Sequence, residues 1–394
     1  MTAELERVGN ASSLHASGRR ARRVVEESRE RVAESLGVRP SDVVFTSGGT
    51  EADNLAIKGL FWSGRDADDS RTALAVSAAE HHAVLDPTQW LIDHEGAAVC
   101  FLPVDSTGRL DLDGLRECIS EHASQLGLVS IMWANNEVGA ISPIAEIADI
   151  VRSRGVLLHS DAVQAVGWVD VDASLVDALT VSGHKVGGPL GVGALVVGRD
   201  LSPTPLLHGG GQERDIRSGT LDVPAVAGFA AALEAAVSTR LERSRAIAAL
   251  RDNLIARVLD AVPDAVLNGP AVGGPTSGGP TLGRADLNGS GDSALRLPGN
   301  AHFTFPGCEG DALLMLLDAA GVECSTGSAC QAGVPQPSHV LLAMGADDAS
   351  ARGSLRFSLG HTSTARDVDE LIAALTPSVD RARRAGLTTV PAGA

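Results

Sequence analysis

Short apolar runs rich in β-branched residues alternate with helix-like segments from about residue 43 onward. Segments with helical spacing, such as 85–94 and 144–154, lie between several of these runs. This alternation is typical of βαβ units, so we predict an α/β fold with a mostly parallel sheet covered by helices on both faces. The runs are 43–46, 74–76, 99–104, 128–132, 156–159, 179–182 and 192–197.

The pattern changes in the last third of the chain. Helical spacing over 223–262 leads into 269–299, which holds nine Gly and four Pro and is expected to be a flexible surface segment without a core. Strand-like and helix-like segments then follow at 302–305, 311–320, 354–359 and 365–384. We therefore predict an N-terminal segment (1–15), a large domain (16–240) and a smaller C-terminal α/β domain (241–394).

Charge and cysteine usage exclude several classes of protein. Among the 394 residues, 32 Lys+Arg stand against 49 Asp+Glu, and a net charge of −17 opposes general binding to nucleic acid or to an anionic membrane. No apolar run approaches the ~18 residues of a membrane span, and the first residues lack a signal-peptide core, so we expect a cytoplasmic protein. The five cysteines are scattered and form no C-x-x-C pair, which predicts neither a disulfide framework nor an intrinsic metal site.

A small-residue turn follows the first strand. Residues 47–51 read Ser-Gly-Gly-Thr-Glu and lead into a helical segment. Glycines let backbone N–H groups approach an anion, and a helix N-terminus offers unpaired donors, so Gly49 and Thr50 are candidates for binding a phosphate group. The alternative is a βα turn whose glycines serve only tight packing.

A lysine and an acid each follow a later strand. Lys185 lies among small residues after the run at 179–182, where it could form a Schiff base with an aldehyde or simply be a solvated loop residue. Asp161 follows the run at 156–159, and a carboxylate there would keep a pyridinium nitrogen protonated. A phosphate turn, an acid and a lysine in this order, each at the end of a strand, indicate pyridoxal 5′-phosphate.

Two residues of the C-terminal part are further candidates. Small residues surround Cys330 in Ser-Thr-Gly-Ser-Ala-Cys, which suits a thiol that must move, although a structural cysteine is the alternative. Arg356 lies inside a predicted strand, where an arginine is costly unless paired. It could hold a substrate carboxylate in a bidentate fork or form a structural salt bridge.

Taken together, the motifs resemble the cysteine desulfurases of the class V aminotransferase-like family, in the group that serves iron–sulfur cluster assembly. The resemblance covers nearly the whole chain and implies the type I fold of pyridoxal-phosphate-dependent transferases. The matching segments are 9–15, 46–59, 80–85, 135–139, 182–189, 209–220, 326–330 and 356–360.

The resemblance also implies a role for each candidate. Lys185 would hold the cofactor and move protons, Arg356 would bind the carboxylate of L-cysteine, and Cys330 would take its sulfur as a persulfide and release alanine. His81 would stack on the cofactor ring, and acid/base catalysis by its imidazole stays open beside stacking alone. Asp161 would contact the pyridinium nitrogen, Asn136 and Gln164 would approach the hydroxyl side of the ring, and Asn136 would also bind the substrate. The implied phosphate ligands are Gly49, Thr50, Ser182 and His184. Thr220 would reach the phosphate bound by the other subunit of a homodimer.

The chain departs from the family pattern at its start, because the usual leading strand and turn before Gly9 are missing. We expect either that the start codon is assigned too late or that the chain is an inactive sulfur-relay or scaffold protein. A selenocysteine lyase is a further alternative. As partners we expect sulfur-acceptor proteins, for cluster assembly or tRNA thiolation, with Cys330 as a transient iron–sulfur contact through its persulfide.

Overall fold

The computed structural model describes residues 1–272, 295–327 and 336–387, and it divides the chain into two compact units. Unit 1 comprises Met1–Pro103, Leu110–Ala134 and Ser142–Arg240, and unit 2 comprises Val104–Arg109, Asn135–Ile141 and Leu241–Ala394. Asn136 therefore belongs to a different unit from Lys185. The domain bounds at residues 15 and 240 stay a prediction.

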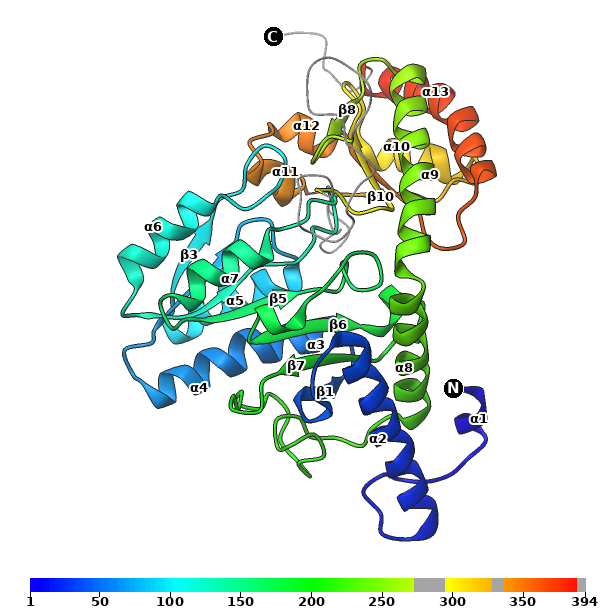
Figure 1. The fold of residues 1–394 in the computed structure, drawn as a ribbon. Helices are drawn as coiled ribbons and strands as arrows, with labels where there is room; N and C mark the ends of the chain where they lie inside the picture. Colours follow the sequence, from blue (N-terminus) through cyan, green and yellow to red (C-terminus); the bar gives the residue numbers. More distant parts are fainter. Residues whose placement is uncertain (273–294, 328–335, 388–394) are drawn as a thin grey trace. The chain divides into compact units, whose positions relative to one another are not determined.

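Unit 1 is built on a seven-stranded sheet in the order β1-β7-β6-β5-β4-β2-β3 (Figure 1). The strands from β3 across to β6 pair in parallel, whereas β7 is antiparallel to both β6 and β1. Most strand residues are buried, as expected for a sheet covered on both faces. The strands are β1 (Val43–Thr46), β2 (Ala73–Ser77), β3 (Ala98–Leu102), β4 (Leu126–Ser130), β5 (Leu157–Asp161), β6 (Ala178–Ser182) and β7 (Gly193–Val197).

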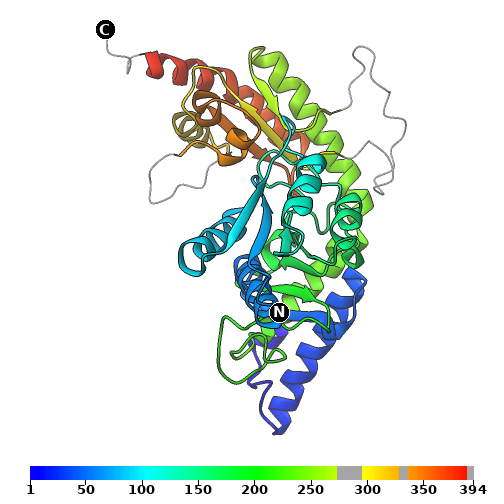
Figure 2. The ribbon, with the colours of Figure 1, turned by 90° about the vertical axis from the view of Figure 1, so that its left-hand side faces the viewer.

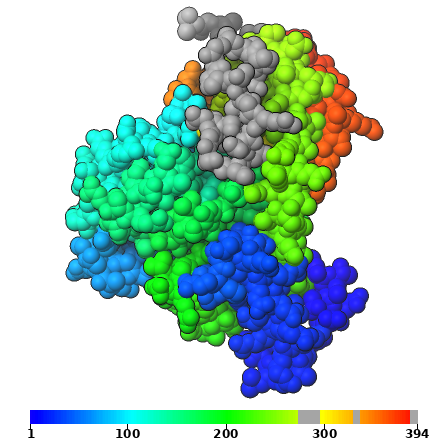
Figure 3. Space-filling view, in the orientation of Figure 1, coloured from blue at the N-terminus to red at the C-terminus, as the bar shows by residue number. Residues whose placement is uncertain are grey.

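Helices cover the sheet of unit 1. The long α2 begins where the side chain of His15 accepts a hydrogen bond from Gly18 N, and it ends at Gly37 in the left-handed conformation. It packs against α8, and Figure 3 shows its outer surface in blue. The helices are α1 (Thr2–Leu5), α2 (Ala16–Leu36), α3 (Gly49–Asn54), α4 (Leu60–Ala67), α5 (His82–Glu95), α6 (Leu112–His122), α7 (Ile144–Arg152) and α8 (Val223–Ser238), with short helices at Pro40–Asp42, Leu55–Gly59, Ala173–Leu175 and Gly183–Val186.

Unit 2 contains an antiparallel sheet in the order β10-β11-β9-β8. Its core joins Phe303, Phe305 and Phe357 of the sheet with apolar residues of α10 and α13, and the red α13 can be followed in Figure 2. The strands are β8 (Val266–Asn268), β9 (Asn300–Thr304), β10 (Ser325–Thr326) and β11 (Ser354–Ser358), and the helices are α9 (Arg240–Ala261), α10 (Gly310–Asp318), α11 (His339–Ala343), α12 (Asp348–Arg352) and α13 (Ala365–Leu387).

The α/β fold with a mostly parallel sheet is confirmed. Each of the seven apolar runs predicted in the first half overlaps a strand, whereas β8 and β10 are too short to stand out in the sequence. Most of the Gly/Pro-rich segment 269–299 lies outside the described residues. Among the helices that the structure describes, none combines the length and the apolar character needed to span a membrane.

Candidate functional site

The carboxyl ends of β1 and β6 meet at one edge of the unit 1 sheet. Thr46 and Ser182, the last residues of these strands, both pair with Gly193 of β7. A Cβ at position 193 would lie 2.7 Å from Val181 O and 2.9 Å from the carbonyl carbon of Gly48, so only glycine fits between them. The turn after β1 and the turn after β6 are therefore neighbours, at the edge where α/β proteins bind ligands.

The turn after β1 is shaped for an anion. Gly48 has φ 151° and ψ −175°, a conformation available only to glycine, and no atom lies within 4 Å of where its Cβ would be. Gly49 begins α3, where a Cβ would lie 3.0 Å from Val163 Cγ2 and 3.6 Å from Ser182 Cβ. Thr50 is exposed. Open space therefore lies next to Gly48 in a turn that packs beside Ser182.

The carboxylate of Glu51 at this turn is paired with an arginine. Glu51 Oε2 accepts a hydrogen bond from Ser47 N at 2.7 Å, and Glu51 Oε1 lies 2.8 Å from Arg217 Nε. Burial raises the pKa of Glu51, but the hydrogen bonds from Arg217 and Ser47 outweigh it and lower the pKa below its ordinary value. Because Arg217 balances this charge, the turn can still accept an anion.

The turn after β6 carries three candidates. Gly183–Val186 forms a short 3₁₀ helix that holds His184 and Lys185 just beyond Ser182. Ser182 Oγ and His184 Nδ1 are 2.9 Å apart, so these two predicted phosphate ligands contact each other. Burial and the nearby Lys185 lower the pKa of His184, and Lys185 itself is exposed.

Asp161 ends β5 as a buried carboxyl group. Its Oδ1 accepts a hydrogen bond from Val163 N at 2.8 Å. Burial raises the pKa of Asp161 to about 6, against the opposing effects of this hydrogen bond and of Lys185. A buried carboxylate of this kind gains from a cationic partner, as a protonated ring nitrogen would be.

Behind Asp161 lie buried polar residues that sequence reasoning missed. His159 contacts Ser130 Oγ at 2.9 Å through Nδ1 and Thr180 Oγ1 at 3.0 Å through Nε2, and burial lowers its pKa to about 3. Burial, and after it the charge of Asp161, raise the pKa of Asp53 well above its ordinary value. His159 Nε2 lies 3.7 Å from Asp53 Oδ1, and burial disfavours the charged form of both groups. The alternating polar residues at the ends of the 156–159 and 179–182 runs are the signal that could have indicated this cluster.

The remaining unit 1 candidates occupy turns at or near helix ends. His81 is the N-cap of α5, and its Nδ1 accepts a hydrogen bond from Ala83 N at 3.1 Å, so the neutral ring carries its proton on Nε2. Gln164 is half-buried three residues after Asp161. Thr220 is exposed at the end of the 209–220 loop. Their contacts with a cofactor stay predictions.

Unit 2 holds the two substrate candidates. Arg356 of β11 donates a hydrogen bond from Nη1 to Asn136 O at 2.8 Å. Burial lowers the pKa of Arg356, while Glu137 opposes that effect. The roles of Arg356 and Asn136 in substrate binding stay predictions, and Cys330 lies outside the described residues.

Comparison with known proteins places the chain in a family. The model of the aminotransferase class-V family matches residues 3–278 and 282–371. The chain belongs to the aminotransferase class-V family. An IscS-like cysteine desulfurase of Mycobacterium tuberculosis is 54% identical over 394 residues, which cover 100% of this chain and 95% of that protein.

Solved structures of this family have the same fold. A NifS-like protein matches with a TM-score of 0.81 and 33% identity over 95% of this chain and 92% of its own. A structure of SspA in complex with cysteine matches with a TM-score of 0.68 and 29% identity over 90% of this chain and 92% of its own.

The class-V family uses pyridoxal 5′-phosphate, and the unit 1 edge fits this group. The glycine turn and the Ser182 and His184 pair offer donors to a phosphate, Lys185 offers an amine to the aldehyde, and buried Asp161 offers a carboxylate to the ring nitrogen. Each of these residues lies at or shortly after the carboxyl end of a strand of one sheet.

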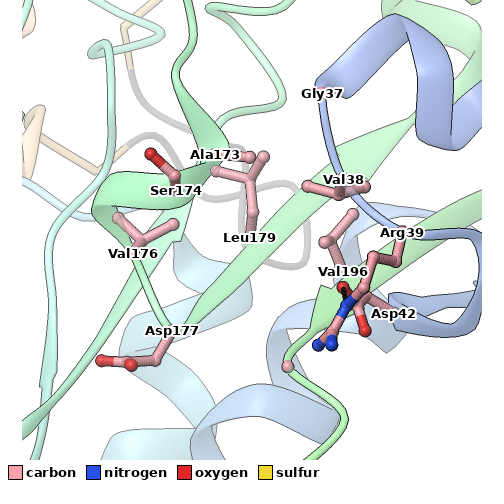
Figure 4. A pocket seen from close by; sticks show the side chains of 11 residues that line it. Gly37, Val38, Arg39, Asp42, Ala173, Ser174, Val176, Asp177, Leu179 and Val196 are labelled. Carbon is pink, nitrogen blue, oxygen red and sulfur yellow. Dashed lines mark hydrogen bonds and ion pairs between the residues drawn. The ribbon is translucent and has the colours of Figure 1, made fainter.

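A separate hollow of about 430 Å³ lies away from this edge (Figure 4). Its lining includes Asp177 and Leu179 at the start of β6, whereas the cofactor residues follow the end of that strand. Arg39 and Asp42, the charged pair at its rim, are bonded to each other at 3.0 Å. Residues 1–272, 295–327 and 336–387 contain no group of three His, Cys, Asp or Glu side chains placed to hold a metal ion.

Proposed function

We propose that this protein is a cysteine desulfurase, which removes sulfur from L-cysteine and gives L-alanine and an enzyme persulfide on Cys330. The observation that carries the proposal is similarity over the whole chain. The chain is 54% identical over 394 residues to an IscS-like cysteine desulfurase. Asp161 ends β5, and Lys185 follows the end of the adjacent strand β6.

The unit 1 residues bind the cofactor and move protons. When bound, pyridoxal 5′-phosphate supplies an electron sink for a carbanion at the substrate. Asp161 would hold the protonated ring nitrogen, and Lys185 Nζ would anchor the cofactor and move protons to and from the substrate carbons. Gly49, Thr50, Ser182 and His184 bind the phosphate, and His81 and Gln164 approach the ring.

The unit 2 residues bind the substrate and take its sulfur. Arg356 holds the carboxylate of L-cysteine beside Asn136, whose carbonyl fixes one guanidinium nitrogen. The Cys330 thiolate attacks the substrate sulfur, so that an S–S bond forms and the C–S bond breaks. The electron pair stays on carbon, where the proton of the substrate thiol completes the methyl group of alanine. Atoms and electrons balance without an outside oxidant or reductant.

The proposal also covers the oligomeric state, the location and the sulfur acceptors of the protein. We propose a cytoplasmic homodimer in which Thr220 reaches the phosphate bound by the partner subunit. Sulfur leaves as the Cys330 persulfide to an acceptor protein for iron–sulfur cluster assembly or tRNA thiolation, with a transient contact to iron at most. The full-length similarity to an IscS-like protein supports this assignment.

The test is turnover with purified protein. Incubation with L-cysteine and a reducing thiol is expected to release alanine and sulfide in equal amounts. Lys185→Ala is expected to lose the absorbance band of the bound cofactor, whereas Cys330→Ala keeps the band and loses turnover. Full turnover by Cys330→Ala, or no alanine from the parent protein, would refute the assignment.

A further inference from the structure

Glu137 lies buried in unit 2 between the two ends of the segment that carries Cys330. Its side chain accepts a hydrogen bond at Oε2 from Ser338 Oγ at 2.5 Å. Gly327, the last described residue before Cys330, packs against the same oxygen, since a Cβ there would lie 2.7 Å from Glu137 Oε2 and 3.3 Å from Ser338 Cβ. One carboxyl oxygen therefore contacts residues 327 and 338 together.

The backbone around Glu137 is fixed from two sides. Glu137 N donates to Asn135 Oδ1 at 2.9 Å, and Glu137 O accepts a hydrogen bond from Asn300 Nδ2 at 2.8 Å. The preceding carbonyl, Asn136 O, accepts from Arg356 Nη1. The carboxyl group thus projects from a backbone held by β9 and β11, and it cannot shift without disturbing the residue proposed to bind substrate.

Both ends of the cysteine-bearing segment depend on this arrangement. Before Gly327, β10 pairs with β11 so that Ser325 lies opposite Arg356. After the segment, Ser338 caps α11, because its Oγ also accepts a hydrogen bond from Leu341 N at 3.1 Å. The Ser338 hydroxyl thus links the start of α11 to the Glu137 carboxyl group.

The charged and titratable groups around Glu137 come from the strands packed against it. Burial raises the pKa of Glu137 to about 7, opposed by the Ser338 hydrogen bond and by Arg356 of β11. His302 of β9 is fully buried, and burial followed by the charges of Arg356 and Arg296 lowers its pKa to about 3, so it is neutral. Arg356 is therefore the cation that faces Glu137.

We propose that Glu137 is a positioning residue for sulfur transfer: its carboxyl group holds residues 327 and 338 together and so fixes the two points from which the segment carrying Cys330 departs. Joined ends lower the entropy cost of placing a residue of the segment, because fewer conformations must be lost. The inference rests on the proposed function, since Cys330 is the sulfur acceptor there. Glu137 acts through Ser338 and Gly327.

The experiment compares three variants of the holoenzyme. Glu137→Ala removes the acceptor of the Ser338 hydrogen bond, and Ser338→Ala removes its donor. Glu137→Gln keeps a side-chain oxygen that can accept this hydrogen bond. Asp347→Ala is the matched control, because it removes another helix cap in unit 2, the hydrogen bond from Ser350 N to Asp347 Oδ1 at 2.7 Å. We measure the absorbance change on adding cysteine, the single-turnover rate of persulfide formation on Cys330 by mass spectrometry, and hydrogen exchange over residues 325–327 and 338–341.

We expect cofactor loading to stay within about twofold of the parent, because none of the variants removes a proposed ligand of the cofactor. The rates are compared at saturating cysteine, because Glu137 faces Arg356, the residue proposed to bind the substrate. Persulfide formation is expected to slow at least about tenfold in Glu137→Ala and Ser338→Ala, since small misplacements of a reacting group cost this much or more. Glu137→Gln is expected to recover most of the rate, and exchange is expected to rise at both ends together.

Two results would overturn the proposal. One is a parental rate of persulfide formation in both alanine variants, and the other is an equal loss in Asp347→Ala, which would mark a general effect of destabilising unit 2. The exchange measurement keeps the proposal separate from the proposed function. If the parent protein forms no persulfide, the desulfurase assignment fails. If hydrogen exchange at residues 325–327 and 338–341 is unchanged in Glu137→Ala, the proposed positioning role of Glu137 is refuted whatever the activity.

Discussion

Arg217 Nε lies 2.8 Å from Glu51 Oε1, and this ion pair joins two loops far apart in the sequence. Glu51 follows the turn proposed to bind the phosphate of the cofactor, and Arg217 lies three residues before Thr220, proposed to reach the phosphate of the partner subunit. Both side chains are about 15% exposed, at 16% for Arg217 and 14% for Glu51, so solvent screens the pair only in part. The pair therefore links the start of α3 to the loop that ends at Thr220.

Removing Arg217 is expected to weaken cofactor binding. In Arg217→Met the Glu51 carboxylate stays at the turn without its cation and repels an incoming phosphate, so we expect the dissociation constant for pyridoxal 5′-phosphate to rise at least about tenfold. Adding Glu51→Gln in the same chain removes the unbalanced charge and should restore much of the affinity. Titration of the cofactor-free protein, followed by absorbance, measures both effects.

The control for this prediction is Arg39→Met. Arg39 pairs with Asp42 at 3.0 Å by the hollow at the start of β6, away from the phosphate turn. Its loss should leave cofactor affinity unchanged. Parental affinity in Arg217→Met, or an equal loss in Arg39→Met, would contradict a specific role of the Glu51 and Arg217 pair.

Asp161→Asn is expected to stabilise the cofactor-free protein but to weaken its binding of pyridoxal 5′-phosphate. The pKa of Asp161 is about 6 in the fold against an ordinary value of 3.8, so the folded state binds more protons and its stability falls as the pH rises from about 4 to 6. Above pH 6 the penalty is about 3 kcal/mol. Asparagine removes it, so the melting temperature of the cofactor-free protein at pH 7 should rise.

The same substitution should lower the affinity for the cofactor, because asparagine cannot stabilise a protonated ring nitrogen. Melting curves with and without pyridoxal 5′-phosphate measure both effects on one sample. A cofactor-free variant that melts below the parent at pH 7, or one that binds the cofactor as tightly, would contradict the assigned role of Asp161.

The strands and the residues that follow them could be predicted from the sequence, because both signals are local. Apolar runs mark the seven strands of unit 1, and Asp161 and Lys185 each follow such a run. The antiparallel direction of β7 was not predicted, although the connection at 183–192 is short for a parallel crossover, which needs about a dozen residues or more.

Partners across long sequence distances could not be predicted. Glu137 lies in an Asn-Asn-Glu-Val-Gly motif that reads as a polar turn, and only the folded chain brings Ser338 to it, 201 positions later. Arg217 and Glu51 are 166 positions apart. No periodicity records such contacts, since they depend on how β-strands are ordered in the sheets and not on the neighbours of each residue.

Acid is expected to destabilise the protein through two buried histidines. His159 and His302 are neutral in the fold, with pKa values of about 3 against an ordinary 6.5. The unfolded chain binds the extra protons, so stability is lost as the pH falls from 6.5 toward 3, by about 2 kcal/mol for each histidine at pH 5. His159→Gln should flatten the pH dependence of the urea midpoint between pH 7 and 5, whereas His361→Gln at an exposed position should not. An unchanged slope in His159→Gln would contradict this account.

One edge of the unit 1 sheet, at β1, is covered by an ion pair instead of a strand. β1 is an edge strand, and Glu213 Oε2 accepts a hydrogen bond from Phe45 N at 2.8 Å while Arg29 Nη1 donates to Val43 O at 2.6 Å. Arg29 and Glu213 also bond each other in a fork, at 2.8 and 2.6 Å. The two side chains together satisfy the backbone groups that a neighbouring strand would use.

Glu213→Ala is therefore expected to destabilise unit 1 strongly. The substitution leaves Phe45 N without its acceptor, and it leaves the Arg29 guanidinium, 11% exposed, with the half-exposed Glu26 as its remaining carboxylate partner. Breaking a buried pair from one side costs about 3–5 kcal/mol. Replacing both partners by Arg29→Met and Glu213→Leu removes the unpaired charge, so the double variant should be more stable than Glu213→Ala. Glu370→Ala, which breaks an exposed pair, should cost under about 1 kcal/mol and serves as the control. Urea midpoints of the cofactor-free proteins test the order, and a Glu213→Ala midpoint equal to that of Glu370→Ala would show that the edge does not depend on this pair.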